Sequence, residues 1–170
     1  MLIRLAKKNE LHLIQKIAFE TWPIVYENIL SDDQLAYMLK MMYEVDVLVS
    51  QQDHLKYQFI LAFDESGNEV GFACYSKEIK YDATYQLHKL YILPTKQGKK
   101  VGSMLLDFVL NEIKKTAEKS VLQLNVNRQN NAVNFYLKKG FSILYEEDND
   151  IGEGYFMNDY VMQKDVSPIH

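Results

Sequence analysis

The stretch Gln86–Leu106, QLHKLYILPTKQGKKVGSMLL, predicts a strand, a turn and a helix in immediate succession. Residues 87–93 are rich in apolar and aromatic side chains, and Pro94 ends this run because proline cannot donate a hydrogen bond to a sheet ladder. Residues 95–100 form a polar turn that contains Gly98. From Val101 onward, apolar side chains recur at the i, i+3, i+4 spacing of an amphipathic helix.

The turn in front of this helix predicts an anion site. A glycine-bearing loop that leads into a helix presents free backbone N–H groups and the positive end of the helix dipole, and this combination binds phosphate. Lys96, Lys99 and Lys100 form a basic cluster there. The dinucleotide and P-loop fingerprints do not match, since Ser103 follows Gly102 where a P-loop requires lysine. From these residues alone, an ordinary strand-to-helix turn with solvated lysines is an equally good interpretation.

A second stretch follows with the same strand–turn–helix order. Residues 121–127 alternate between apolar and polar side chains, which is typical of a half-buried strand. A polar turn at 128–131 precedes a helical segment at 132–139, and Gly140 occupies a C-cap position. Phe141 and Ile143 then begin another strand.

Together, QGKKVGSMLL and LNVNRQNNAVNFYLKKGF resemble the acetyl-CoA signature of the GCN5-related N-acetyltransferases, the GNAT superfamily. Gln97 and Gly102 match the loop motif [QR]-x-x-G-x-[GA] of that family. The later A-x-x-F-Y-x-K-x-G-F segment is matched by Ala132, Phe135, Tyr136, Lys138, Gly140 and Phe141. The resemblance is strong over residues 85–145 and loose on both flanks.

Lys100 departs from the motif, which usually has glycine there. Because lysine cannot adopt a positive φ as cheaply as glycine, we expect the backbone of Lys100 in a region open to L-residues. With Lys99, it would add a cation beside a pyrophosphate.

The resemblance implies acetyl-CoA as the co-substrate. The pyrophosphate would lie on the N–H groups of residues 99–103, and the pantetheine arm would run along residues 91–93 like an added strand. Asn127 and Asn130 would bind the same arm, although capping the next helix explains either one as well. The family's usual asparagine falls on Gln129 here, so the register stays open. The full set implied for the cofactor is Tyr91, Ile92, Leu93, Gln97, Gly98, Lys99, Lys100, Val101, Gly102, Ser103, Asn127, Asn130 and Lys139.

Two residues are predicted to be catalytic. By resemblance, Tyr136 points at the CoA sulfur, and a phenol with a pKa of about 10 can protonate the departing thiolate; a core tyrosine is the alternative. His88 stands where many relatives have a glutamate that acts as a general base. A neutral imidazole could accept the proton of the amine directly or through a water, and a partly exposed strand histidine is the alternative.

The acceptor side is less sharply predicted. Trp22, Tyr26 and Tyr155 fall near the expected substrate-facing loops, and a place in the core or at its rim is the alternative for each. The acidic stretch from Glu146 to Glu153 either forms a solvated hairpin or attracts a cationic substrate. The stretches ILSDDQLAYML and YFMNDYVMQK are loosely similar to the spermidine/spermine acetyltransferases of the superfamily.

Composition narrows the classes of function. The net charge of −4 and the absence of a basic stripe argue against nucleic acid as a partner. No apolar run approaches the length of a membrane span, and the N-terminus has no apolar signal core, so we expect a cytoplasmic protein. The single cysteine, Cys74, is expected to be a buried, inert thiol. The four histidines, His12, His54, His88 and His170, show no metal-ligand spacing.

The chain is expected to form a single domain over residues 1–170, of the α/β (α+β) class, with a mixed, mostly antiparallel central sheet flanked by helices in the order βααβββαβαββ. Asn9 is predicted to cap a helix that ends at Trp22-Pro23, and Ser31 with Gln34 to begin a second helix that ends near Tyr43. Further strands are predicted at 2–5, 57–63, 69–79, 141–147 and 155–163.

The sequence thus predicts transfer of an acetyl group from acetyl-CoA to a primary amine by direct attack in a ternary complex, and we expect the acceptor to be a small polyamine-like molecule. A protein or peptide acetyltransferase and a non-catalytic acyl-CoA sensor are the alternatives. The sequence leaves open whether the chain forms a homodimer.

Overall fold

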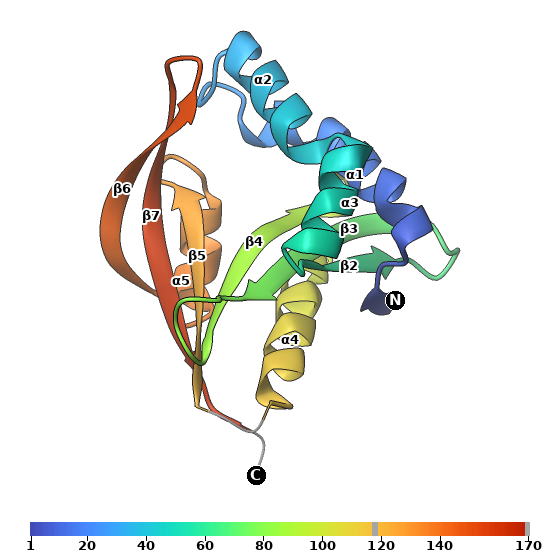
Figure 1. The fold of residues 1–170 in the computed structure, drawn as a ribbon. Coiled ribbons are helices and arrows are strands. Elements are labelled where there is room, and N and C mark those ends of the chain that lie inside the picture. Colours follow the sequence, from blue (N-terminus) through green and yellow to red (C-terminus); the bar gives the residue numbers. More distant parts are fainter. Residues whose placement is uncertain (117–118, 169–170) are drawn as a thin grey trace. The chain divides into compact units, whose positions relative to one another are not determined.

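The computed structural model describes residues 1–116 and 119–168, and its chain divides into two compact units (Figure 1). Unit 1 comprises residues 1–76 and 88–112, and unit 2 comprises residues 77–87 and 113–170. Each unit is described separately below.

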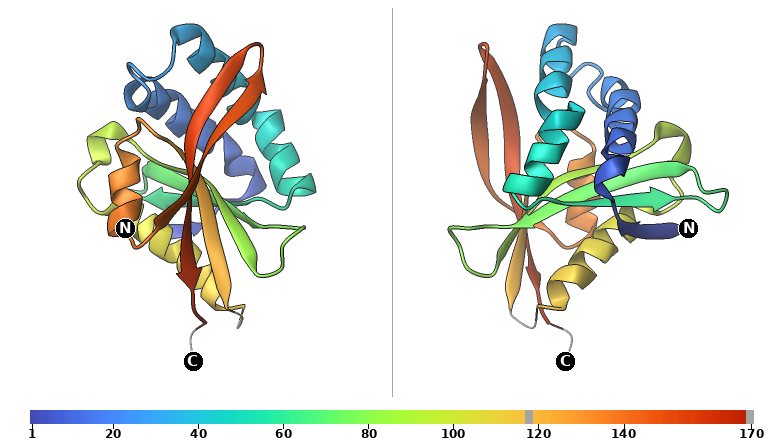
Figure 2. Two further views of the ribbon diagram at one scale, coloured as in Figure 1. Left: turned by 90° about the vertical axis from the view of Figure 1, so that its left-hand side faces the viewer. Right: turned by 45° about the vertical axis from the view of Figure 1, so that its right-hand side comes forward.

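Unit 1 is built on antiparallel strands. Strand β1 (Leu2–Leu5) pairs with β2 (Gln58–Phe63), and β2 pairs with β3 (Glu69–Lys77). The helices are α1 (Leu11–Val25), α2 (Asp32–Tyr43), α3 (Val45–His54) and α4 (Val101–Lys114), with short 3-10 turns η1 at Lys8–Glu10 and η2 at Pro94–Lys96. Figures 1 and 2 show α1, α2 and α3 on one face of β2 and β3, and α4 on the opposite face.

Helix α1 corrects one prediction. The helix does not end at Trp22-Pro23: it contains Pro23 and continues to Val25, where the N–H of Tyr26 donates to the Trp22 carbonyl at 3.0 Å. Proline removes one intrahelical hydrogen bond, but it tolerates the last turn when packing holds that turn in place. Here Trp22, which is only 1% exposed, supplies that packing.

Of the next two helices, α2 was predicted and α3 was not. Helix α2 begins as predicted, because the Ser31 Oγ accepts a hydrogen bond from the Gln34 N–H at 3.1 Å. Helix α3 was not predicted, so the observed order has one helix more than the predicted one. Leu48 is its one buried residue, so it carries almost no apolar stripe.

Unit 2 is built on a second set of paired strands. The start of β4 (Thr84–Ile92) pairs in parallel with β5 (Ser120–Asn127), from Thr84↔Val121 to Leu87↔Leu124. Strand β5 pairs in antiparallel fashion with β7 (Tyr155–Val166), and β7 pairs with β6 (Ser142–Gly152). Helix α5 (Ala132–Lys138) lies between β5 and β6 in the chain.

The strand order β1-β2-β3-β4-β5-β7-β6 is mixed and mostly antiparallel, which confirms the predicted fold class. Strand β4 starts three residues before the predicted Leu87, and β6 and β7 extend beyond their predicted ends to Gly152 and Val166. Among the residues that the structure describes, no helix is long and apolar enough to cross a membrane.

Candidate active site

The turn in front of α4, in unit 1, has the backbone of an anion-binding loop. Gly98 and Lys100 both have positive φ values, of 79° and 61°. The expectation that Lys100 avoids this region is therefore wrong: the lysine takes the left-handed conformation that the motif's glycine would take more cheaply. The Lys100 carbonyl accepts from the Met104 N–H at 3.0 Å, so the helix starts directly after it. The first N–H groups of such a helix have no intrahelical partner.

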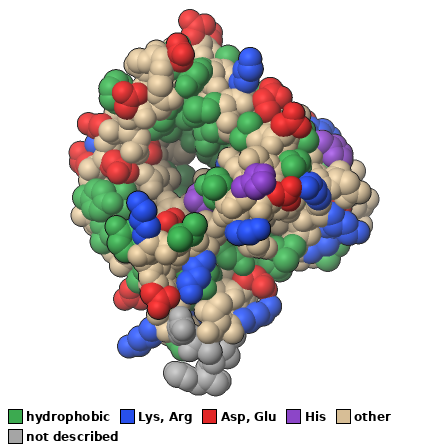
Figure 3. All heavy atoms as spheres, in the orientation of Figure 1, with side chains coloured by type: hydrophobic (Ala, Val, Ile, Leu, Met, Phe, Trp, Pro, Cys, Tyr) green, Lys and Arg blue, Asp and Glu red, His purple; other side chains and the backbone are tan. Residues whose placement is uncertain are grey.

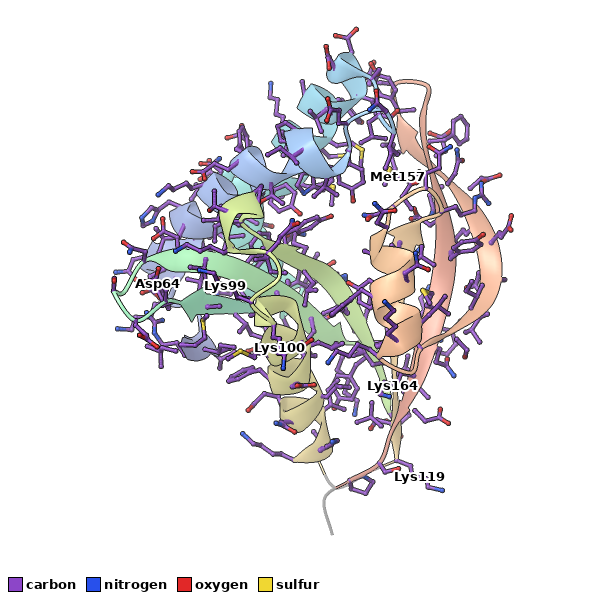
Figure 4. All side chains as sticks on the ribbon, turned by 180° about the vertical axis from the view of Figure 1, so that it is seen from behind. Asp64, Lys99, Lys100, Lys119, Met157 and Lys164 are labelled. Carbon is purple, nitrogen blue, oxygen red and sulfur yellow. The ribbon has the colours of Figure 1, made fainter. Side chains whose placement is uncertain are left out.

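Three lysines in this turn divide into two kinds. The Lys96 Nζ lies 3.0 Å from the Asp64 Oδ2 in the β2–β3 turn, and this ion pair lowers the pKa of Asp64. Lys99 and Lys100 are exposed at the start of α4, where Figure 4 labels them. These two lysines, rather than all three, are the cations that remain for a bound anion.

The end of β4 also has a defined orientation. The Leu93 N–H donates to the Val70 carbonyl of β3 at 2.9 Å. Because N–H and C=O groups alternate in direction along a strand, Ile92 presents its backbone groups to the side away from β3. Gly71 lies so close to this segment that an added Cβ would be 2.9 Å from the Tyr91 carbonyl oxygen. Of the three residues predicted to bind the pantetheine arm, Ile92 therefore has the suitable backbone orientation.

Two predicted acceptor residues meet one predicted cofactor residue in unit 1. The ring centroids of Trp22 and Tyr26 are 4.6 Å apart, and those of Trp22 and Tyr91 are 5.7 Å apart. The hydroxyl groups of Tyr26 and Tyr91 are 2.9 Å apart. Tyr43 joins this cluster with a centroid 5.4 Å from that of Trp22, and burial raises the pKa of Tyr43. The sequence predicted Tyr43 only as the end of a helix, although it lies four residues after Leu39 and therefore on the same buried face.

His88 lies half-buried between a polar and an aromatic side chain within unit 1. Its Nε2 is 2.7 Å from the Ser76 Oγ, and its ring stacks on Tyr57 with centroids 3.9 Å apart. Burial lowers the pKa of His88 to about 3, and the neighbouring charge of Lys89 adds to this fall. Lys89 is itself buried, with its Nζ 5.2 Å from the centroid of the Tyr43 ring. The imidazole is therefore neutral at physiological pH.

In unit 2, Tyr136 is anchored by the end of its own helix. The side chain is buried, and its ring packs edge-on against Phe135 and Phe141 with centroids 5.2 and 5.5 Å apart. Gly140 has a φ of 83°, and the reversal it permits lets the Phe141 N–H donate to the Tyr136 carbonyl at 3.0 Å. The G-F pair of the motif thus holds the tyrosine in place.

The predicted asparagines close short turns in front of α5 and do not cap it, because the N-cap of α5 is Asn131, which makes no side-chain capping hydrogen bond. The Asn127 Oδ1 accepts from the Gln129 N–H, and the Asn130 Oδ1 accepts from the Ala132 N–H, both at 2.9 Å. Lys139 is the C-cap of α5, and Tyr155 is half-buried at the start of β7. Their contacts with a cofactor or acceptor stay predictions.

A buried carboxylate in unit 2 was missed. Asp159 on β7 is 6% exposed, and burial raises its pKa to about 6. The available signal was its position on β7, because the buried Val161 lies two residues further along the same strand face.

The part of the chain that the structure describes contains no group of three or more His, Cys, Asp or Glu residues that could hold a metal ion. His170, one of the histidines considered in the sequence, lies outside the described residues.

Comparison with known proteins identifies the family. Residues 27–162 match the model of the acetyltransferase (GNAT) domain. The chain belongs to the GNAT acetyltransferase family. A curated relative, the spermidine N(1)-acetyltransferase of Thermoplasma acidophilum, is 30% identical over 170 residues, which is 95% of each chain.

Two solved structures illustrate how far this GNAT fold is shared. The PaiA N-acetyltransferase from T. acidophilum, solved in complex with coenzyme A, is 27% identical, has a TM-score of 0.76, and is matched over 96% of this chain and 99% of its own. A GCN5-related N-acetyltransferase from Rhodopseudomonas palustris is 18% identical with a TM-score of 0.78, over 96% of this chain and 94% of its own. The second similarity concerns the fold alone.

Proposed function

We propose that this GNAT acetyltransferase transfers an acetyl group from acetyl-CoA to a primary amine of a small polyamine-like molecule. The observation that carries the proposal is the 30% identity, over 95% of both chains, with a protein named spermidine N(1)-acetyltransferase. The related PaiA structure, which contains coenzyme A, supports the choice of cofactor.

In this proposal, acetyl-CoA is held by backbone groups and two lysines. Its pyrophosphate accepts hydrogen bonds from the N–H groups that begin α4 and interacts with Lys99 and Lys100. The positive φ values of Gly98 and Lys100 support this arrangement, because alternating backbone conformations turn successive N–H groups toward one point. The pantetheine arm pairs with the backbone of Ile92, whose groups point away from β3.

The chemistry is a direct attack of the neutral amine on the thioester carbonyl. The C–N bond forms as a tetrahedral oxyanion appears, and a backbone N–H of β4 stabilises that charge. Collapse of the intermediate breaks the C–S bond, and Tyr136 gives its proton to the departing thiolate. The attacking nitrogen loses one proton to water as the amide forms, and a proton from water restores the phenol, so that the proton balance closes. The buried, edge-packed ring of Tyr136 supports this role, since a proton donor must be held in one orientation.

His88 is too weak a base to take the proton of the ammonium directly. With a pKa of about 3, the imidazole is a much weaker base than an alkyl amine, whose ammonium form titrates near 10. Direct transfer between them is strongly uphill. We therefore assign His88 the role of accepting a hydrogen bond from a water molecule that carries the proton away, with Ser76 fixing the ring through Nε2.

The test replaces Tyr136 with Phe and follows CoA thiol release with acetyl-CoA and a panel of spermidine, spermine, amino acids, aminoglycosides and short peptides. For the polyamines we expect kcat to fall about 10²- to 10⁴-fold, while calorimetry shows CoA affinity within about twofold of wild type. Tyr145→Phe, which removes the hydroxyl of an exposed tyrosine on β6, is the matched control.

Other outcomes assign the chain differently. Turnover with peptides alone would make it a protein acetyltransferase. Binding of acetyl-CoA without turnover of any acceptor would favour the sensor alternative. Full turnover in Tyr136→Phe would refute the role of the tyrosine.

A further inference from the structure

The three strands β5, β7 and β6 of unit 2 carry a polar row on one face. Residues directly opposite each other in a sheet share a face, and Asp159 lies opposite both Asn127 of β5 and Glu147 of β6. Asn125 and Asn149 are two residues along from these partners, so they lie on the same face. We call Asn125, Glu147, Asn149 and Asp159 the carboxylate row.

On the opposite face of the same strands, acidic side chains form ion pairs with an arginine. Arg128 places its Nη1 3.0 Å from the Glu146 Oε2, and its Nη2 contacts the Asp148 Oδ1. Acidic side chains along this hairpin appear in red at the left edge of Figure 3. The arginine is therefore engaged on the face that does not carry Glu147 and Asp159.

Within the carboxylate row, the two acids are solvated unequally. The Glu147 Oε2 accepts from the Asn125 Nδ2 at 2.9 Å and from the Asn149 Nδ2 at 3.1 Å. Asn125 is fixed in turn, because its Oδ1 accepts from the Gln86 Nε2 at 3.2 Å. The Asp159 Oδ1, by contrast, is buried and has no hydrogen-bond partner among the described residues.

No described lysine or arginine forms an ion pair with either acid. Two carboxylates directly across a sheet repel each other, and a buried oxygen without a donor costs free energy. Burial is the main cause of the raised pKa of Asp159, the amide of Asn125 opposes it, and the charge of Glu147 adds to it. Arg128 lowers this pKa only weakly from the other face.

We infer that Asp159 and Glu147 bind an ammonium group of the acceptor, a nitrogen other than the one that is acetylated. This inference rests on the proposed function. A carboxylate stabilises a protonated amine, whereas the attacking nitrogen must be neutral, so the bound ammonium and the nucleophile are different atoms of one di- or polyamine. An ammonium has three N–H donors for the Asp159 Oδ1 and neighbouring oxygens.

A divalent metal is the less suitable occupant. Calcium takes six to eight oxygen ligands and magnesium demands an octahedron, whereas the row offers two carboxylates and amide oxygens, one of which is already used by Gln86. The row also adjoins Asn127, a predicted cofactor contact, which lies directly opposite Asp159.

The experiment compares Asp159→Asn with the matched control Asp165→Asn, which removes the same charge from an exposed position on the same face of β7. Spermidine and butylamine binding to the full chain, with CoA present, are measured by calorimetry at pH 7.5. We expect Asp159→Asn to weaken spermidine binding roughly ten- to a hundredfold, the effect of losing a charge-assisted hydrogen bond. Butylamine binding should change less than about twofold, because a monoamine has no second ammonium.

Glu147→Gln is the second variant, and we expect a smaller loss of spermidine affinity because two amides already donate to its Oε2. Equal spermidine affinity in Asp159→Asn and Asp165→Asn, with both variants folded, would overturn the inference. Magnesium binding that depends on Asp159 while spermidine binding does not would overturn it in favour of a metal. Spermidine binding that depends on Asp159 without any acetyl transfer would refute the proposed function and leave the cation site intact.

Discussion

The buried carboxylate of Asp159 lowers the stability of the folded protein when it is ionised. Its folded-state pKa of about 6 lies above the ordinary value of 3.8, so the folded protein holds this proton more tightly than the unfolded chain does. Ionisation therefore destabilises the fold. The penalty is absent below about pH 3.8, grows between pH 3.8 and about 6, and is complete above that range.

This penalty can be measured as a gain in stability on mutation. At pH 7.5, Asp159→Asn should raise the free energy of unfolding by on the order of 1–3 kcal/mol, because it removes a buried charge and its repulsion from Glu147. At pH 3.5 the variant and the wild type should be equally stable. Urea unfolding at both pH values, with Asp165→Asn as the control, checks this. A variant less stable than wild type at pH 7.5 would contradict it.

Single residues also show where sequence patterns carry information. Tyr136 and Gly140 stand out by their motif, and the catalytic role of Tyr136 stays a prediction, because its buried ring also suits a core tyrosine. The environment of His88 was not predictable, because Ser76 and Tyr57 reach it from other strands and segments. Asp159 was missed for a related reason: its spacing from Val161 places it on the same face of β7, but the burial of that face depends on the pairing of β5, β7 and β6.

At the scale of elements, the turn before α4 is where the chain differs most from its family motif. Lys100 has a φ of 61°, so a residue with a Cβ stands in the left-handed region at a cost of about 1–2 kcal/mol. Its charge beside the proposed pyrophosphate site offers a reason to keep it. The element thus combines strain and charge in one residue.

Two substitutions separate these contributions. Lys100→Ala removes the charge and keeps the strain, whereas Lys100→Gly removes both. We expect the glycine variant to be more stable than the alanine variant by about 1 kcal/mol in urea unfolding. Both should bind CoA with similarly reduced affinity in calorimetry. Equal stability of the two variants would show that the left-handed conformation carries no cost here.

Elements with strong periodicity were predictable, and those without it were not. Helix α4 begins at the predicted Val101, and α2 begins at its predicted cap, Ser31. Helix α3 has the sequence VDVLVSQQDH, in which three β-branched valines alternate with Asp46, Leu48 and Ser50, a pattern that favours a strand over a helix. Helix α1 continues beyond Pro23 because the tertiary packing of Trp22 outweighs the missing hydrogen bond.

At the scale of the whole molecule, the family resemblance predicted the class of the sheet, and local patterns predicted the order of the elements along the chain except for α3. They did so because the glycines, caps and apolar runs that define each element lie close together in sequence. That residues 1–170 act as a single domain stays our proposal. The division into two compact units makes this proposal testable.

Cooperative unfolding is the test. Trp22 is the only tryptophan and is buried in unit 1, so its fluorescence reports on that unit, while far-UV circular dichroism reports on the backbone of both. For a single cooperative domain we expect the two signals to share one urea midpoint. A fluorescence transition clearly separated from part of the dichroism signal would show that the units unfold independently.

Cys74 has a practical consequence for work on this protein. It is the only cysteine, it is fully buried in β3, and burial raises its pKa to about 12. The native chain therefore contributes no reactive sulfur to a colorimetric reagent, and every equivalent of colour in a turnover assay belongs to the released coenzyme. When the protein unfolds, the Cys74 thiol becomes accessible and reacts with the reagent, one equivalent per chain. Its rate of reaction therefore reports the rate of unfolding.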